Sequence, residues 1–218
     1  MKILFIGNSY TYRNDMPDIF FGLLQGNGID AEVAAVTRGG QKLFRYLGED
    51  EENNAALTAL LEKNSYDLLF LQEQSYFPLS NYPQFELGVR ELAKLVSAKR
   101  TILYATWGRK TGCELLETLG LTSEEMADAL EAAYRKAAAL IGAEVSSVGL
   151  CFKEITRLDP TAELYKEDLS HPSYLGSCVA AVAHYRKAMG MLPEIYTNLN
   201  LDENEIKLIF KAVERVFA

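Results

Sequence analysis

The chain has 218 residues, of which 49% are hydrophobic and 24% charged, and its formal net charge is −8. This length and composition predict a single α/β domain, residues 1–218, with an interior large enough to be stable without disulfides. The acidic balance argues against nucleic acid as a partner, and the absence of any Lys/Arg cluster argues against an anionic membrane.

Cysteine usage and the N-terminus bear on the compartment. Cys113, Cys151 and Cys178 are scattered and odd in number, and their spacing matches neither a metal site nor a disulfide framework. Met1-Lys2 leads directly into the first predicted strand, with no apolar signal segment, and no run approaches the ~18 apolar residues of a membrane span. We therefore expect reduced thiols, a cytoplasmic protein and no membrane partner.

The first predicted strand ends in a turn that carries a serine. Residues 2–6 are apolar and β-branched, and Gly7-Asn8-Ser9 ends the run, as in a buried parallel strand. Asn and Ser are favoured helix N-caps, so one interpretation is that Asn8-Ser9 only caps the next helix. Open α/β sheets bind ligands at the carboxyl edge of their strands, and the other interpretation places Ser9 in such a site.

Helices and strands alternate along the rest of the chain. Apolar spacing, caps and breakers predict helices over 17–25, 41–47, 53–63, 83–98, 122–141, 150–157, 173–189 and 203–217, and strands over 31–36, 66–71, 101–106 and 144–148. A period of about 30 residues per unit is typical of right-handed βαβ crossovers around a parallel sheet. The fold class is therefore α/β, as one three-layer αβα domain of about five strands.

Polar loops follow the predicted strands, at the edge where α/β sheets place their sites. They are Asn8-Ser9, Gly39-Gly40, Gln72 to Ser75 and Trp107 to Lys110, and a later loop holds Asp168 to Pro172. A hydroxyl needs a base to become a good nucleophile, and imidazole is the usual base. The chain has two histidines: His184 lies inside a predicted helix, where a structural role is expected, whereas His171 lies in the late loop.

His171 has a carboxylate three residues upstream, at Asp168. An imidazole base needs an acceptor on its second nitrogen, which fixes the tautomer and stabilises the imidazolium. Asp168 is able to supply that acceptor from the same loop. Asp and His are also common in ordinary loops, so this spacing alone is weak evidence of a site.

Taken together, these segments resemble the SGNH (GDSL-like) hydrolases, in the same order over the whole chain. The segments are Gly7-Asn8-Ser9-Tyr10-Thr11, Gly39-Gly40, the Gln-rich turn after the third strand and Asp168-x-x-His171. Within that superfamily, residues 6–11, 71–75, 106–109 and 171–173 are similar to the branch known as the DUF4886 domain.

The resemblance implies a flavodoxin-like three-layer fold with strand order 2-1-3-4-5, and ester hydrolysis through a Ser-His-Asp triad without a cofactor. By position it makes Ser9 the nucleophile, His171 the general base and Asp168 the orienting partner. The family's glycine after the second strand falls on Gly39 or Gly40. We favour Gly40, as the residue that opens the following helix, and expect its N–H and that of Ser9 to face the oxyanion.

The chain departs from the family pattern at two positions. Asn8 replaces the aspartate of the common GDS signature, but that position is not the proton acceptor of the triad. The family's third block carries an Asn whose amide completes the oxyanion hole, and here the aligned residues are Gln72-Glu73-Gln74. Gln74 offers the same amide one methylene longer, Gln72 is the alternative, and Glu73 would oppose an oxyanion if it pointed inward.

Aromatic residues in these loops suggest the substrate. Trp107, Tyr10, Tyr12 and Tyr76 have faces suited to sugar rings, and Arg109 suits a carbonyl or carboxylate. Trp107 packing beneath the loop as core is the structural alternative. We expect a substrate-binding role for Trp107, Arg109 and Tyr76, and an acetyl or other short-acyl ester of a carbohydrate or other small molecule as substrate.

Three functional hypotheses follow. The first is a serine esterase, and the second is a catalytically weak or inactive SGNH-fold protein that binds carbohydrate. A flavin or nucleotide module is third, because Gly7 to Thr11 lacks the glycine spacing of a dinucleotide turn or phosphate loop. We expect no metal, since the sequence has no HxxxH, HxH or Cys/His cluster.

Overall fold

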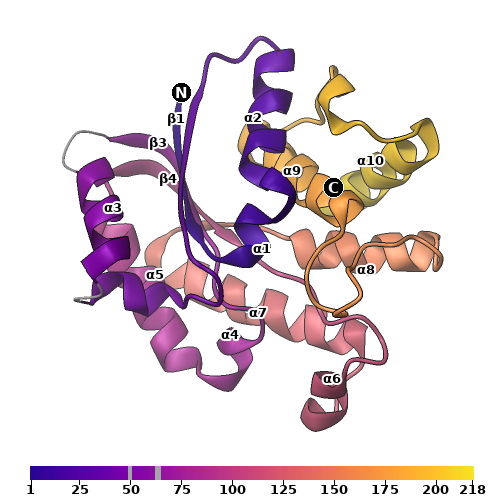
Figure 1. Cartoon of the computed structure of the whole chain (residues 1–218), viewed down its shortest axis with the longest axis horizontal. Helices are drawn as coiled ribbons and strands as arrows, with labels where there is room; N and C mark the ends of the chain where they lie inside the picture. Colours follow the sequence, from indigo (N-terminus) through magenta and orange to yellow (C-terminus); the bar gives the residue numbers. More distant parts are fainter. Residues whose placement is uncertain (49–50, 62–64) are drawn as a thin grey trace.

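A parallel sheet forms the centre of the protein (Figure 1). The computed structural model describes residues 1–48, 51–61 and 65–218, with the main chain alone at 51–54. The strands in that part of the chain are β1 (Lys2–Gly7), β2 (Glu32–Thr37), β3 (Tyr66–Leu71), β4 (Ala98–Tyr104) and β5 (Glu144–Ser146). They pair in parallel in the order β2-β1-β3-β4-β5, which confirms the predicted fold class and strand order.

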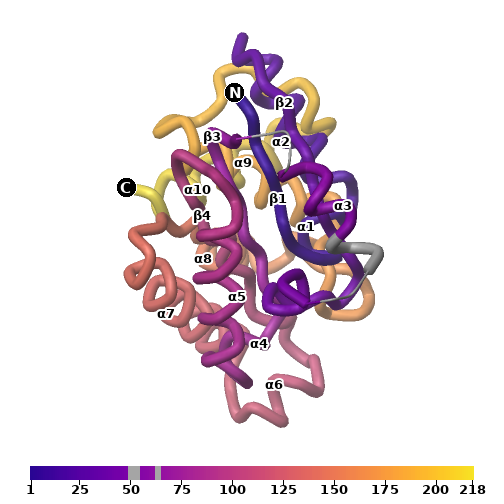
Figure 2. The backbone as a smooth tube through the Cα atoms, turned by 90° about the vertical axis from the view of Figure 1, so that its left-hand side faces the viewer, coloured from indigo at the N-terminus to yellow at the C-terminus, as the bar shows by residue number. Residues whose placement is uncertain are grey.

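Helices cover both faces of this sheet, giving three layers (Figures 1 and 2). One face is covered by α2 (Met16–Gly26), α8 (Val148–Leu158), α9 (Tyr174–Met189) and α10 (Glu203–Phe217). The other is covered by the 3-10 helix η2 (Leu43–Leu47), α3 (Glu51–Leu61), α5 (Tyr82–Leu95) and α7 (Ser123–Ile141). Short helices complete the chain: α1 (Ser9–Tyr12), η1 (Arg13–Asp15), α4 (Phe77–Ser80), α6 (Glu114–Leu119) and η3 (Thr197–Leu199). Within the described residues, each helix is too short or too polar to cross a membrane.

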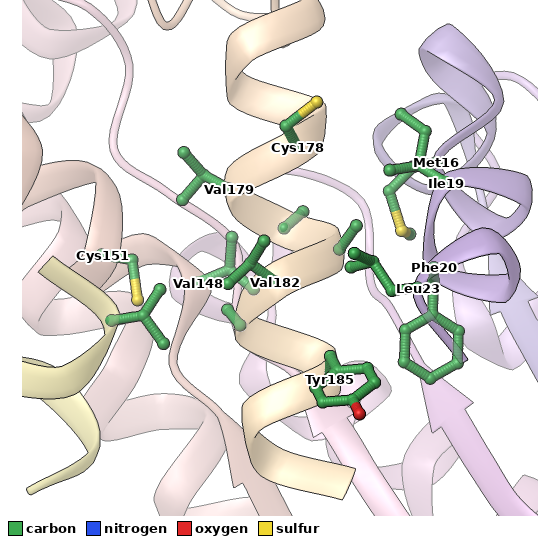
Figure 3. Close-up of a cluster of buried hydrophobic side chains, with 14 of the residues drawn as sticks. Met16, Ile19, Phe20, Leu23, Val148, Cys151, Cys178, Val179, Val182 and Tyr185 are labelled. Atoms are coloured by element: carbon green, nitrogen blue, oxygen red, sulfur yellow. The ribbon is translucent and has the colours of Figure 1, made fainter. Parts of the chain in front are cut away.

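Side chains of β1 face the two helical layers in turn, which explains why its sequence is apolar throughout. Ile3 and Phe5 pack against the layer of α2 and α9, whereas Leu4 and Ile6 pack against the opposite layer. Figure 3 shows the first of these cores, with side chains of α9 between those of α2 and α8. A central strand buried on both faces gives a rigid base for the turn that follows it.

Several predicted boundaries shift. The predicted strand over 101–106 is β4, which begins at Ala98, and the helix predicted over 83–98 ends at Leu95. Lys99 and Arg100 concealed this start, because charged residues are unusual in a strand. They fit here because each reaches a surface carboxylate at this end of the sheet, Asp67 for Lys99 and Glu144 for Arg100.

Two more predicted elements, a strand and a helix, differ from the structure at their ends. The strand predicted over 144–148 ends at Ser146, because α8 begins at Val148. The helix predicted over 53–63 is α3, which begins at Glu51, and positions 62 and 63 lie outside the described residues.

His184 is a structural residue, as predicted from its place inside a helix. Its ring is fully buried, 4.2 Å by centroid from Tyr104 and 4.9 Å from Phe70. Nδ1 is 2.8 Å from Ser146 Oγ, and Nε2 is buried without a hydrogen-bond partner among the described residues. Burial lowers the pKa of His184 to about 3, so the imidazole is neutral in the folded protein at pH 7.

We expect this histidine to reduce stability in acid. Between pH 6.5 and about 3 the unfolded chain binds a proton on His184 that the folded chain does not. The free energy of unfolding therefore decreases as the pH is lowered through this range. The slope contributed is at most ~1.4 kcal/mol per pH unit. Urea unfolding at pH 7, 6, 5 and 4 should show a smaller slope for the double variant His184→Leu/Ser146→Ala, which removes both hydrogen-bonding partners. Ser146→Ala alone keeps the buried imidazole, so it is the control and should keep the steeper slope; equal slopes in all three proteins would contradict the prediction.

Candidate active site

The first turn after β1 places Ser9 at the carboxyl edge of the sheet, between the ends of β2 and β3. Asn8 is the N-cap of α1, and its Oδ1 accepts a hydrogen bond from Tyr10 N at 3.1 Å. The capping interpretation is therefore correct for Asn8. It leaves the hydroxyl of Ser9, the first residue of α1, available for another partner.

That partner is His171, from the loop before α9. Ser9 Oγ lies 2.9 Å from His171 Nε2, although 162 positions separate the two residues. On the other side of the ring, His171 Nδ1 lies 2.5 Å from Asp168 Oδ2. The structure thus brings together the three side chains expected to form a triad, in the order hydroxyl, imidazole, carboxylate. This order permits a proton to move from Ser9 to an imidazole whose second nitrogen is held by Asp168.

Asp168 is held as an anion by its own loop. Its Oδ1 accepts hydrogen bonds from Ser170 N at 3.0 Å and His171 N at 2.8 Å, and its Oδ2 contacts the His171 ring. Burial opposes the charge, but these hydrogen bonds outweigh it and lower the pKa of Asp168 to about 2. The site is open to solvent: the side chains of His171 and Asp168 are 25% and 49% exposed.

Asn14 anchors the histidine loop, a role that the sequence analysis missed. Its Nδ2 lies 3.2 Å from Pro172 O and 3.0 Å from Ser173 O, joining the start of the chain to the residues after His171. Asn14 has a positive φ of 54°, which Asn tolerates better than most residues. The available sequence signal was an Asn-Asp pair just before the Pro-initiated helix. On the other side of the loop, Lys110 N donates to Leu169 O at 2.9 Å.

The prediction that Trp107 contacts substrate is wrong. Its side chain is 0% exposed, stacked between Tyr10 at 4.5 Å and Phe152 at 4.4 Å by ring centroid. Its Nε1 donates to Ser170 O at 3.0 Å, next to His171. Tyr10 is also buried and meets the His171 ring edge-on at 5.6 Å, so these rings support the histidine from beneath and offer no face to a sugar.

The predicted oxyanion donors lie on the loops around Ser9. As the first residue of α1, Ser9 has an N–H without an acceptor inside the helix. Gly40 is exposed, has a φ of 67° and donates no main-chain hydrogen bond within the described part of the chain. The next helix begins at Leu43, so Gly40 does not open it as we expected. Its place in the Arg38–Gln41 turn is what leaves its N–H available.

The two glutamines of the third block have different surroundings. Gln72 is buried: its Oε1 accepts hydrogen bonds from Asn8 N and Thr11 Oγ1, both at 2.9 Å, and its Nε2 donates to Glu73 O. Gln74 is partly buried, and its side-chain amide makes no hydrogen bond within the described residues. Of the two, Gln74 therefore has the amide that is available to a substrate oxygen.

Two other predicted substrate contacts stay predictions. Arg109 is partly buried, and its Nε has no hydrogen-bond partner among the described residues. Tyr76 is partly buried and packs against the small apolar cluster of Leu116, Met126 and Leu130.

Comparison with known proteins places this chain in a family. No family model and no curated protein matches the chain. Among solved structures, a protein of Slackia heliotrinireducens assigned to the SGNH hydrolases is 32% identical, with a TM-score of 0.75 over 86% of this chain and 98% of its own. A DUF4886 family protein of Bacteroides uniformis is 16% identical, with a TM-score of 0.79 over 99% of this chain and 94% of its own.

A variant of an acetyl-xylooligosaccharide esterase from Geobacillus shares the fold at 18% identity, with a TM-score of 0.62 over 93% of this chain and 95% of its own. The identity and coverage of the Slackia protein, together with the parallel sheet in the order β2-β1-β3-β4-β5, agree with the motifs read from the sequence. This chain belongs to the SGNH hydrolase family.

Proposed function

We propose that this protein is a serine esterase that cleaves a short-acyl ester, such as an acetyl ester, of a carbohydrate or other small molecule. The observation that carries the proposal is the contact of Ser9 Oγ with His171 Nε2, with Asp168 on the opposite side of the ring. A serine hydroxyl aligned in this way has the base that its nucleophilic attack requires.

The reaction proceeds in two halves. Ser9 Oγ attacks the ester carbonyl while His171 Nε2 takes the hydroxyl proton, and the N–H groups of Ser9 and Gly40 with the amide of Gln74 bind the oxyanion. The imidazolium then gives its proton to the leaving alcohol, and the acyl group stays on Ser9. Water attacks this acyl-enzyme with His171 again as base, releasing the carboxylic acid and restoring the hydroxyl.

Two observations support the carbohydrate part of the proposal. The Geobacillus structure of the same fold is described as an acetyl-xylooligosaccharide esterase. Tyr12 is exposed, and its hydroxyl lies beside Gly39 at the edge of the site. Its aromatic face is suited to a sugar ring, a contact that the buried Trp107 does not offer.

The proposal is tested by following p-nitrophenyl acetate and a panel of acetylated sugars with purified protein. We expect turnover with both, and faster turnover with short acyl chains than with long ones. Tight binding of the sugars without release of acid would instead support the catalytically inactive carbohydrate-binding protein.

Gln74 gives a prediction within the same assay. We expect Gln74→Ala to lower kcat by roughly 10²-fold with little change in KM, because the amide acts on the oxyanion and hardly on the ground state. Gln84→Ala, at the exposed start of α5, is the matched control and should keep the wild-type kcat. An unchanged kcat in Gln74→Ala would mean that main-chain donors alone form the hole.

A further inference from the structure

A buried glutamate joins the two loops that carry the proposed oxyanion donors. Glu73 is the second residue after β3 and is 0% exposed. Its Oε1 accepts a hydrogen bond from Gln74 N at 2.6 Å, and its Oε2 accepts one from Leu43 N at 3.2 Å. Leu43 lies three residues after Gly40, at the start of η2, which follows the loop beyond β2. One carboxyl group therefore binds the main chain on both sides of β1, the strand that leads to Ser9.

The backbone of Glu73 is also fixed. Its N–H donates to the hydroxyl of Tyr134, on α7, at 3.1 Å, and its carbonyl accepts from Gln72 Nε2. Its side chain is thus held at the buried end of the loop, directed to main-chain N–H groups. The carboxyl group of Glu73 therefore bridges the main chain of two segments beside the predicted oxyanion hole.

We propose that Glu73 is the positioning residue of the oxyanion hole, whose carboxyl group fixes the spacing between Gly40 and Gln74 around Ser9. This inference rests on the proposed esterase function, because the hole has a role only if Ser9 attacks a carbonyl. Glu73 does not touch the substrate in this account. It acts through the two loops that do.

The charge state of Glu73 matters to such a hole. Burial raises its pKa to about 8, against the opposing effects of the N–H groups of Gln74 and Leu43 and the ammonium of Lys42. The other titratable groups that act on it are the hydroxyls of Tyr46 on η2 and Tyr134 on α7. Burial raises the pKa of both hydroxyls well above its usual value. Around pH 8 both tyrosines are neutral, and Glu73 is the group among these that changes charge.

The sign of the pH effect follows from when each interaction acts. The hydrogen bonds of Glu73 to the main chain exist in both the ground state and the transition state, so they leave kcat unchanged when they strengthen. A negative charge beside the hole disfavours only the oxyanion, which exists in the transition state. Activity should therefore fall as pH rises through about 8 and Glu73 ionises.

Two variants test this inference. We expect Glu73→Ala to lower kcat about 10- to 100-fold while KM changes less than about threefold, because the loops lose their bridge. In Glu73→Gln an amide oxygen in the place of Oε1 carries no charge and is still able to accept from both Gln74 N and Leu43 N, which lie 2.6 Å and 3.3 Å from that atom. We therefore expect this variant to keep at least a third of the wild-type kcat at pH 7 and to lose the decline above pH 8. His171 is present in all these proteins, so the difference between their profiles isolates Glu73. Glu86→Ala, on α5, is the control and should keep both kcat and the decline.

Each outcome bears on a separate claim. A wild-type kcat in Glu73→Ala, or an unchanged alkaline decline in Glu73→Gln, would overturn the positioning role and leave the esterase proposal intact. If Glu73→Ala does not fold, the pH profile of Glu73→Gln decides alone. A wild-type protein that hydrolyses no ester in the panel would overturn the proposed function, and the positioning role with it.

Discussion

Replacing Ser9 with alanine should remove nearly all ester hydrolysis. We expect kcat on p-nitrophenyl acetate to fall roughly 10⁴- to 10⁶-fold, because the variant has no hydroxyl to form the acyl-enzyme and water must attack unaided. The fold should persist, since Asn8 caps α1 in place of Ser9. The measurement is steady-state kinetics, with circular dichroism to check folding.

A matched control separates Ser9 from other serines. Ser80, exposed at the end of α4, should tolerate alanine with an unchanged kcat. A fluorophosphonate probe should add its mass to a peptide containing Ser9 in the wild type, and should fail to do so in His171→Ala, where no base activates the hydroxyl. Hydrolysis at the wild-type rate in Ser9→Ala would place the reaction elsewhere on the protein.

The second large effect is expected at Asp168. In Asp168→Asn the side-chain oxygen is still able to accept from Ser170 N and His171 N, but the new amide would face the ring nitrogen at which a carboxylate now accepts. The imidazole would then present its proton to Ser9 and lack the lone pair that a base needs. We expect kcat to fall by about 10³- to 10⁴-fold with KM nearly unchanged.

Glu167, the exposed acid immediately before Asp168, supplies the control. Glu167→Gln makes the same change in net charge and should keep at least half of the wild-type kcat. Equal losses in the two variants would indicate that the loop's overall charge, and not the contact with His171, supports activity. Because the pKa of Asp168 is about 2, the wild-type carboxylate stays ionised at any pH at which the protein is assayed.

Sequence reasoning predicted the sheet well where burial determines the residue type. Phe70 and its neighbours in β3 are apolar because helices cover both faces, so this strand was placed over 66–71 without error. The start of β4 was missed, because Lys99 and Arg100 extend to the surface at the sheet's edge and break the apolar pattern. The apolar pattern that identifies a strand is weaker at strand ends that reach solvent than at strand centres.

Site residues that belong to a known motif were predictable, whereas residues whose role depends on how their side chains pack were not. Ser9, Asp168 and His171 were singled out by position in known motifs, and their side chains lie in contact. Trp107 was misjudged because the sequence does not show whether an aromatic side chain in a loop faces the solvent or the core. The bridge made by Glu73 depends on a main-chain N–H thirty positions away, which no local pattern reveals.

The site is assembled from opposite ends of the chain, and this has a consequence for synthesis. Ser9 is synthesised just after β1, whereas His171 follows β5, the last strand in the described part of the chain. A nascent chain halted before position 171 contains every described strand and the hydroxyl, but no imidazole to activate it. Docking of the late segment, held by Asn14 on Pro172 and Ser173, therefore brings the imidazole to Ser9 and completes this group of three side chains.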